Sequence, residues 1–578
     1  MIIPFIPSTP PVSPPTTIQT NDAVTPINNR WILWLYGLLL LGFLTPLFFY
    51  EWPIGVDYLT HLTRLYILRH LDSDPYLSQF FQANPAMFSN LGFDVLAGLF
   101  YRIVDLTTAG NITIGISMLA YGISCAWLFY AAHRRISFWM LTSLIFLVQF
   151  NLVVGMISHY LAQSLFFAFL GYLLWRERYS FGWQENLGLA AFSAITFMCH
   201  VFPWLYCLLA WGFWQLYGLG NRHYRLFSRD GCKSVVSSLC LLIPGLIIAL
   251  WSQGGSYVEN SFVTDLDTIN EKITTFNKSF GSIYVDENLY VDFYVVVCFL
   301  ALTAIIISHN KIHKNIFLVG LSLIFLGLAT LFPANILDSG VFDARLYQVV
   351  ITLAVISIFP IIQDKIFLRF CGTFIILCIV TRIGTFTWSA EKITHDVTLY
   401  RSAFQQLDPG KKLLLSMQIQ QNNFCYIYGN PYGDLQCQAD PLQAKGAMHV
   451  SHYTSFAIMD RSVFATPFFA HPAKHSLIVR PAYQAIAEID NIPVYWEWLN
   501  GRSPKGFFMQ SSRLTCFRQQ NCPWPTWRQD FDYIMIMNLR SDFVDPPGMT
   551  LLFTDPRGYA KLYAIDHSWQ PPATPPTQ

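Results

Sequence analysis

The sequence predicts a polytopic α-helical membrane protein of about 11 transmembrane helices with a C-terminal soluble α/β domain. Of its 578 residues, 53% are hydrophobic and 12% are charged, whereas soluble domains carry about 25% charged residues. Apolar stretches near the length that crosses a bilayer recur from residue 31 to residue 389. Beyond residue 390 the apolar runs shorten, and Pro, Asn, Gln and Asp separate them. These observations predict a transmembrane domain at 31–390 and a soluble domain at 391–569.

Each predicted span is an apolar run bounded by polar residues. The spans are expected at 31–50, 110–132, 136–153, 158–175, 187–202, 203–219, 234–252, 291–308, 315–333, 346–363 and 371–389. The segment 187–219 has two interpretations: two short helices meeting near His200 and Pro203, or one long helix. Residues 91–106 are expected to form a partial helix. The first span lacks a small-x-small cleavage site and is expected to stay as an anchor.

Charge asymmetry between the loops predicts the orientation. With the N-terminus inside, the short inner connections hold most of the basic residues: Arg134, Arg135, Arg176, Arg178, Arg222, Arg225, Arg229, Lys233, Lys311, Lys314, Lys365 and Arg369. The longer outer segments hold Arg64, Arg69, Arg102, Lys272, Lys278 and Arg345. This bias places the loops 51–109 and 253–290 and the C-terminal domain outside, in the periplasm if the membrane is a bacterial inner membrane. Residues 1–30, a cytoplasmic tail, and residues 570–578 are expected to be disordered, since they are rich in Pro and Thr.

The C-terminal cysteines give a second indication of the side. Cys425, Cys437, Cys516 and Cys522 fit two local disulfides, 425 with 437 and 516 with 522, although three connectivities exist. Disulfides need an oxidising compartment, which agrees with the orientation from charge. The alternative, a zinc site, is disfavoured because no CxxC occurs. The other eight cysteines lie in or beside spans and are expected to pack as small apolar residues.

The C-terminal domain carries strand patterns but no recognised catalytic motif. Residues 412–417, 532–537 and 560–565 are short apolar runs flanked by turn residues, which predicts buried strands. The domain contains no nucleophile elbow, P-loop or HExxH. The net charge of +1 and the lack of a basic tract argue against a nucleic-acid partner.

Asp57, His61 and Arg64 follow the first span at spacings i, i+4 and i+7. On a helix they share one face. Asp57 could take a proton from a hydroxyl, or hold His61 in one tautomer so that the imidazole does so. Arg64 could bind a phosphate with two parallel hydrogen bonds. The alternative for Asp57 is a helix cap or a solvated loop charge. We predict catalytic roles for Asp57 and His61 and a phosphate-binding role for Arg64.

Three further ionisable residues are expected near the same outer level. His159 opens the fourth span and His200 lies within the fifth. Each could line a cavity or be a hydrogen-bonded packing residue. Arg345 begins the tenth span, against the charge bias. It could pair with Asp343 or bind an anionic head group from the outer leaflet, and the second is favoured. We predict that His159, His200 and Arg345 bind substrate or its phosphate.

The local sequence Gly55-Val56-Asp57-Tyr58-Leu59-Thr60-His61 resembles the Asp-x-x-x-His stretch that follows the first span in the GT-C class of membrane glycosyltransferases. Met198-Cys199-His200 and Phe342-Asp343-Ala344-Arg345 also resemble features of that class. The resemblance covers the architecture of 31–390. It implies a polyprenyl-phosphate sugar donor used on the outer face, with Asp57 as general base on an acceptor hydroxyl. In contrast to many members, Asp57 is followed by Tyr58 rather than by a second acid, which favours a reaction without metal or other cofactor.

Three functions follow from these patterns. The first is transfer of a sugar from a polyprenyl-phosphate donor to a hydroxyl of a glycan, a lipid or a protein. The protein and the lipid-linked donor would both lie in the membrane lipid. The second is a transporter or flippase of lipid-linked saccharides, which needs mid-span charges or inverted repeats. Arg382 is the clearest mid-span charge, and no convincing repeat occurs. The third is a non-catalytic assembly protein for surface polysaccharide.

Overall fold

The computed structural model describes the chain from residue 30 to residue 569 with gaps. Outside the description lie residues 1–29, 56, 86–88, 178–180, 222–226, 252–271, 274, 277–278, 280–288, 334–341, 419–451, 467, 469–474, 485, 488–493, 500–525, 538, 540–541 and 570–578. Both predicted tails, most of the loop 253–290 and all four C-terminal cysteines fall there, so these predictions are untested.

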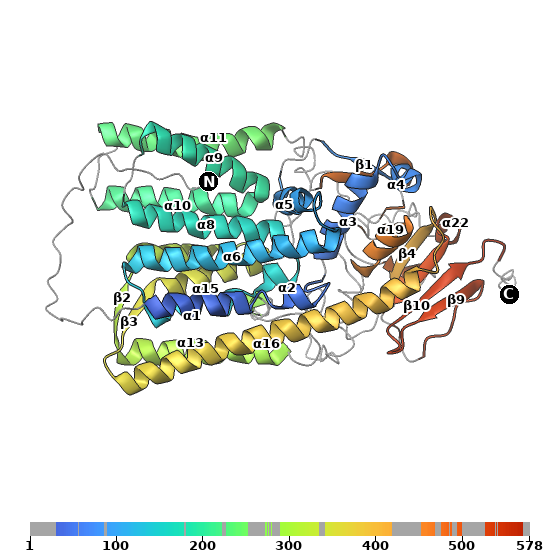
Figure 1. The fold of residues 1–578 in the computed structure, drawn as a ribbon. Helices are drawn as coiled ribbons and strands as arrows, with labels where there is room; N and C mark the ends of the chain where they lie inside the picture. Colours follow the sequence, from blue (N-terminus) through green and yellow to red (C-terminus); the bar gives the residue numbers. More distant parts are fainter. Residues whose placement is uncertain are drawn as a thin grey trace, which may run out of the picture.

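Long apolar helices form a bundle with their axes side by side (Figure 1). They are α1 (Arg30–Gly42), α6 (Leu106–His133), α8 (Ile157–Arg176), α9 (Trp183–Cys199), α10 (Val201–Gly220), α11 (Arg229–Trp251), α13 (Leu289–His309), α14 (Ile316–Leu331), α15 (Phe342–Ile356) and α16 (Lys365–Phe404). Within the described residues, 6 helical segments are long and apolar enough to cross a membrane. They are Arg30–Phe49, which joins α1 to α2 (Pro46–Phe49), α6, α8, α11, the α13 segment Val291–His309, and α16.

Two predicted spans differ from the observed elements. The span predicted at 346–363 is wrong in its second part, because α15 ends at Ile356 and the strand β3 (Ile358–Ile361) follows. Residues 136–153 were expected to form one helix, but they form the 3₁₀ helix η1 (Phe138–Phe146) and the short α7 (Phe150–Val153). The prediction of a span there is wrong. Side-chain hydroxyls hold this tighter winding, since Thr142 donates to the Trp139 carbonyl (2.6 Å) and Ser143 to the Met140 carbonyl (2.9 Å). A 3₁₀ segment of nine residues is unusually long.

The ambiguous segment 187–219 consists of two helices. The α9 helix ends at Cys199, α10 begins at Val201, and His200 between them has extended backbone angles. Phe202 donates its backbone N–H to Nδ1 of His200 (3.2 Å), so the imidazole caps α10. The two-helix interpretation is confirmed, with the break at His200.

One end of the bundle carries the shorter elements that follow the first span (Figure 1). These are α2, α3 (Asp57–His70), α4 (Pro75–Phe80), β1 (Phe81–Ala83) and α5 (Gly92–Phe100). The α5 helix corresponds to the partial helix predicted at 91–106. The opposite end carries a two-stranded antiparallel ribbon of β2 (Lys311–Lys314) and β3 (Ile358–Ile361).

The chain beyond α16 forms a mixed sheet with the order β5-β4-β8-β10-β9, in which β7 also pairs with β4. The strands are β4 (Lys412–Met417), β5 (Phe464–Thr466), β7 (Val494–Tyr495), β8 (Tyr533–Met537), β9 (Met549–Thr554) and β10 (Ala560–Ile565). Neighbours of β4 run parallel to it, and β10 runs antiparallel to β8 and β9. Short helices accompany the sheet: α19 (Ser455–Arg461), η3 (Pro481–Tyr483), α20 (Trp496–Leu499) and α22 (Trp527–Asp530). The three predicted strands match β4, β8 and β10.

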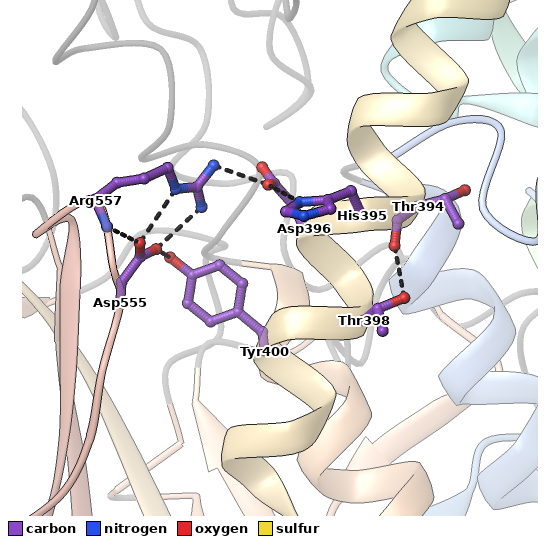
Figure 2. A network of polar contacts seen from close by, with 7 residues as sticks. All are labelled: Thr394, His395, Asp396, Thr398, Tyr400, Asp555 and Arg557. Carbon is purple, nitrogen blue, oxygen red and sulfur yellow. Dashed lines mark hydrogen bonds and ion pairs between the residues drawn. The ribbon is translucent and has the colours of Figure 1, made fainter.

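A continuous helix of 40 residues, α16, joins the bundle to this sheet. Near its C-terminus, Arg557 from the β9–β10 turn contacts Asp396 of the helix (2.8 Å) and Asp555 (3.0 Å) (Figure 2). Tyr400 donates its hydroxyl to the same Asp555 (2.6 Å). A second contact, the two-bond pair of Arg401 with Asp460, fixes α16 to α19. These contacts tie α16 to the β9–β10 turn and to α19.

The loop after α3 is also tied to the C-terminal part. The β1 strand pairs antiparallel with β6 (Leu477–Val479), so Phe81 lies opposite Val479. Asn84 donates to the carbonyl of His475 (2.9 Å). The first polar loop and the C-terminal part therefore form one layer over the end of the bundle.

A buried ion pair joins two helices inside the bundle. Arg382 of α16 lies 2.7 Å from Asp292 of α13, and both side chains are at most 2% exposed. Thr385 also donates to Asp292 (2.7 Å), and the backbone oxygen of Val148 accepts from Arg382. Charges inside an apolar bundle are tolerated when they pair in this way.

Removal of one partner of this pair is expected to be costly, because the other charge stays buried. We expect Arg382→Met to lower the free energy of unfolding by about 3–5 kcal/mol. Thermal unfolding of the purified chain in detergent measures this. The exposed pair of Lys233 with Asp230 is the control, and Lys233→Met should cost less than about 1 kcal/mol. Equal losses in the two variants would contradict a structural role for the buried pair.

Candidate functional site

The first turn of α3 is held against the bundle by close backbone contact. The backbone N–H of Asp57 donates to the carbonyl of Val154 in the turn before α8 (2.9 Å). Gly155 in that turn has φ +86°, and a Cβ there would lie 2.3 Å from the backbone nitrogen of Tyr58. Only glycine fits this close approach and this backbone conformation. Tyr58 in turn donates its hydroxyl to Asn111 of α6 (2.9 Å). The position of Asp57 is therefore fixed by backbone.

The structure brings the six predicted site residues together at the end of the bundle that carries the C-terminal sheet. Asp57 begins α3, His159 lies in the first turn of α8, His200 caps α10, and Arg345 lies in the first turn of α15. His61 and Arg64 follow one and two turns into α3. Four helix N-termini thus gather around these residues. Helix N-termini carry partial positive charge and exposed N–H groups, which favour anions.

The Asp57 carboxyl lies among cations and apolar groups. Burial raises the pKa of Asp57 to about 7, and the nearby guanidinium groups of Arg345 and Arg64 limit the rise. A carboxyl with a pKa near neutrality exchanges a proton readily at physiological pH. Asp57 is partly accessible, whereas the rest of its helix face is buried. This combination suits a group that receives a proton from a bound molecule.

His61 and Arg64 are linked to an acid that the sequence pattern did not single out. Arg64 donates from Nε and Nη2 to the two carboxylate oxygens of Asp94 in α5 (3.1 and 2.6 Å). Its Nη2 also lies 2.7 Å from Nδ1 of His61. A guanidinium has only donors, so Nδ1 of His61 accepts and its proton is on Nε2. Burial and the nearby Arg64, His452 and His200 lower the pKa of His61 well below its usual range. His61 is therefore a neutral imidazole of fixed tautomer.

This arrangement bears on the predicted role of Arg64. The two donors of Arg64 that could bind a phosphate side by side, Nε and Nη2, already donate to Asp94. Of its guanidinium nitrogens, only Nη1 lacks a hydrogen-bond partner among the described residues. The phosphate-binding role of Arg64 stays a prediction. The contacts themselves make Arg64 a positioning residue for His61.

His159 and His200 face each other. Their ring centroids are 4.6 Å apart and the planes are nearly perpendicular. His159 is fully buried in α8, and within the described residues neither of its ring nitrogens has a hydrogen-bond partner. A packing histidine would have at least one. Nδ1 of His200 accepts from the α10 backbone, which places the His200 proton on Nε2.

Arg345 lies beside this histidine pair. Its guanidinium carbon is 5.6 Å from the centroid of the Phe202 ring. The side chain is 6% exposed, and its Nε and Nη1 have no hydrogen-bond partner among the described residues. Arg345 does not pair with Asp343 among the described residues. The Asp343 carboxylate pairs with Lys272 instead (3.0 Å). Arg345 is a buried cation within electrostatic range of the Asp57 carboxyl.

Residues of the C-terminal part pack on the same helix. Thr60 lies 2.9 Å from Nδ1 of His452, and Thr63 donates to the carbonyl of Ser455 (3.4 Å). Ser476 donates to Asp94 (2.9 Å), which already holds Arg64. The sequence patterns gave no role to His452 or to Asp94, although Asp94 is the acid of the partial helix expected at 91–106. Among the described residues, no three His, Cys, Asp or Glu side chains form a group suited to a metal.

The Gly155 contact gives a test of how the site is held. We expect Gly155→Ala to lower the free energy of unfolding by more than about 1 kcal/mol, because alanine is strained at φ +86° and its Cβ meets Tyr58. The control is Gly188→Ala in α9, where a Cβ meets nothing within 4 Å. Alanine there should stabilise the helix by about 0.5–1 kcal/mol. Thermal unfolding in detergent measures both, and effects of the same sign would contradict the contact.

Comparison with solved structures gives a distant likeness in fold. The chain is similar over 93% of its length to the cryo-electron microscopy structure of the arabinofuranosyltransferase AftD from Mycobacteria, with 12% sequence identity and a TM-score of 0.44. It spans 40% of that chain. No protein-family model and no curated protein sequence matches it.

Proposed function

We propose that the protein is a membrane glycosyltransferase of the GT-C type that moves a sugar from a polyprenyl-phosphate donor to a hydroxyl acceptor. Asp57 is the general base. The observation that carries the proposal is the gathering of Asp57, with its pKa near 7, against the buried Arg345 and the His159–His200 pair. The site combines a base of suitable pKa with a cation for a phosphate, at the end of an apolar helical bundle.

The proposed chemistry is one displacement. The acceptor hydroxyl gives its proton to the Asp57 carboxylate, and its oxygen attacks the anomeric carbon of the sugar. The bond between this carbon and the phosphate oxygen breaks, and the electron pair leaves with the polyprenyl phosphate. Arg345 stabilises the negative charge that develops on that phosphate. His61, held as the Nε2–H tautomer, is a hydrogen-bond donor rather than a second base.

The proposed orientation keeps the site and the C-terminal domain on the outer side. It is supported by the separation of the site from the basic connections. Arg134 follows α6 directly, and Lys311 and Lys314 lie in the ribbon at the opposite end of the bundle (Figure 1). A donor whose sugar has been flipped outward would meet the site at the sheet-bearing end.

The alternative functions receive less support. A transport path is usually marked by charges inside the spans. Arg382 is the clearest mid-span charge in the sequence, and it is paired with Asp292. A non-catalytic assembly protein does not require a carboxyl of raised pKa next to a buried arginine that lacks a hydrogen-bond partner at two of its nitrogens. The enzyme proposal accounts for both groups.

Removal of the base tests the proposal. We expect Asp57→Asn to reduce sugar transfer by about 100-fold to 10,000-fold, because the amide cannot accept the proton. Purified protein is assayed with a panel of polyprenyl-phosphate sugars and hydroxyl acceptors, with the unfolding temperature as a check on folding. The control is Asp72→Asn, which changes an exposed acid in the turn just after α3. Undiminished transfer by Asp57→Asn would exclude its role as base.

The pH profile gives a second test. Asp57 must be deprotonated to act, so kcat/KM should rise about tenfold per pH unit up to about pH 7 and level off above it. Arg345→Gln should move this midpoint upward, because the cation that favours the charged carboxylate is lost. The exposed Arg134→Gln should leave it in place. A midpoint near pH 4, the usual value for aspartate, would contradict the environment described for Asp57.

A further inference from the structure

Tyr206 of α10 is a buried tyrosine whose hydroxyl has no hydrogen-bond partner among the described residues. Buried hydroxyls nearly always have one. Three other buried tyrosines of the bundle follow this rule: Tyr36 donates to Gly122, Tyr121 contacts Thr352, and Tyr160 donates to Leu147. Tyr206 is the exception within the described residues of the bundle core.

Two other side chains without hydrogen-bond partners at some of their nitrogens lie near Tyr206. The ring of Tyr206 lies 6.2 Å from that of His159, whose nitrogens also lack partners. Arg345, with two unpartnered nitrogens, lies within electrostatic range of the Tyr206 hydroxyl. The three side chains come from different helices, α8, α10 and α15. Three independent helices thus bring unsatisfied donors to one place.

The ring of Tyr206 is held by apolar neighbours rather than by its hydroxyl. Phe325 and Phe166 pack edge-on against it, with centroids 5.3 and 5.9 Å away. The hydroxyl therefore does not determine where the ring sits. The presence of a hydroxyl at this position is therefore not explained by packing.

The donor set specifies the missing partner. Arginine offers only donors, a tyrosine hydroxyl offers one, and a neutral histidine offers one. Two of the three helices contribute these side chains from their first turns, where partial positive charge favours an anion. A phosphate, with several acceptor oxygens, can satisfy all three groups at once. A neutral sugar hydroxyl would leave the Arg345 charge without a counter-ion.

We propose that Tyr206 is a ligand-binding residue that donates its hydroxyl to the phosphate held by Arg345 and His159. The identity of this phosphate as that of a polyprenyl lipid rests on the proposed function. Tyr206 then contributes to binding of the donor and of the leaving polyprenyl phosphate, while Asp57 acts on the acceptor. The subsite exists before the ligand arrives, because the aromatic packing fixes the ring.

Phosphate binding tests this without any transfer assay. The full chain in detergent is titrated with farnesyl phosphate, followed by tryptophan fluorescence. Tyr206→Phe should raise the Kd about tenfold or more, the usual effect of losing a hydrogen bond to a charged group. Arg345→Gln should raise it about 30-fold or more. Tyr160→Phe is the matched control, since its hydroxyl is already used by Leu147, and its Kd should be unchanged. An unchanged Kd in Tyr206→Phe overturns the proposal.

Two further arms separate the causes. Farnesol, which lacks the phosphate, should bind wild type and Tyr206→Phe with the same Kd. A tenfold difference in the Kd of farnesol would show that the variant weakens binding of the isoprenoid chain, and it would overturn the proposal. Inorganic phosphate should bind at least about tenfold more weakly than farnesyl phosphate, and equal affinity would overturn the assignment to a lipid. Unliganded Tyr206→Phe should unfold at the same or a higher temperature, because the hydroxyl has no partner to lose.

The result is distinguishable from a failure of the proposed function. Asp57→Asn should bind farnesyl phosphate as tightly as wild type or more tightly, because a negative charge near the phosphate is removed. Tyr206-dependent binding in a chain that transfers no sugar would retain the subsite and reject the enzyme. Sugar transfer that depends on Asp57, together with farnesyl phosphate binding that does not depend on Tyr206, would retain the enzyme and reject the Tyr206 subsite.

Discussion

The burial of a polar helix face organises this end of the molecule. The α3 helix carries Thr60, His61, Thr63 and Arg64, all nearly inaccessible to solvent, and a buried polar group without a partner costs about 1–3 kcal/mol. The partners come from elsewhere: Asp94 from α5, and His452 and Ser455 from the C-terminal part. The loop after the first span and the C-terminal part are joined to each other because each satisfies groups on the same helix.

The same demand shapes the electrostatics of the site. Asp94 neutralises Arg64, so Arg64 no longer provides a full counter-charge to Asp57. Burial then governs the Asp57 carboxyl, and its pKa rises towards neutrality. The apolar bundle contributes the rest, since it buries Arg345 and His159 without supplying acceptors to Nε and Nη1 of Arg345 or to the His159 ring among the described residues.

The sequence predicted local features well and tertiary partners poorly. The spacing of Asp57, His61 and Arg64 predicted a shared helix face, and short apolar runs predicted β4, β8 and β10, because both signals are periodic along the chain. The 3₁₀ winding of η1 was not predictable, since an apolar stretch has the same composition in either helix. The pairs Arg64–Asp94 and Arg382–Asp292 join residues 30 and 90 positions apart, and a single sequence carries no signal of such proximity. The unpartnered Tyr206 is visible only once its surroundings are known.

The contacts between α3 and the C-terminal part have a consequence for biogenesis. Thr60 and His452 are 392 residues apart in sequence, so during synthesis the bundle emerges long before the segment that covers α3. Contacts of such separation form late and slowly. The nascent chain therefore passes through a stage in which its helices can insert while the polar face of α3 is still solvated. We therefore expect the contacts between α3 and the C-terminal part to form last. A chain truncated before α19 would insert in the membrane without the partners of Thr60 and Thr63.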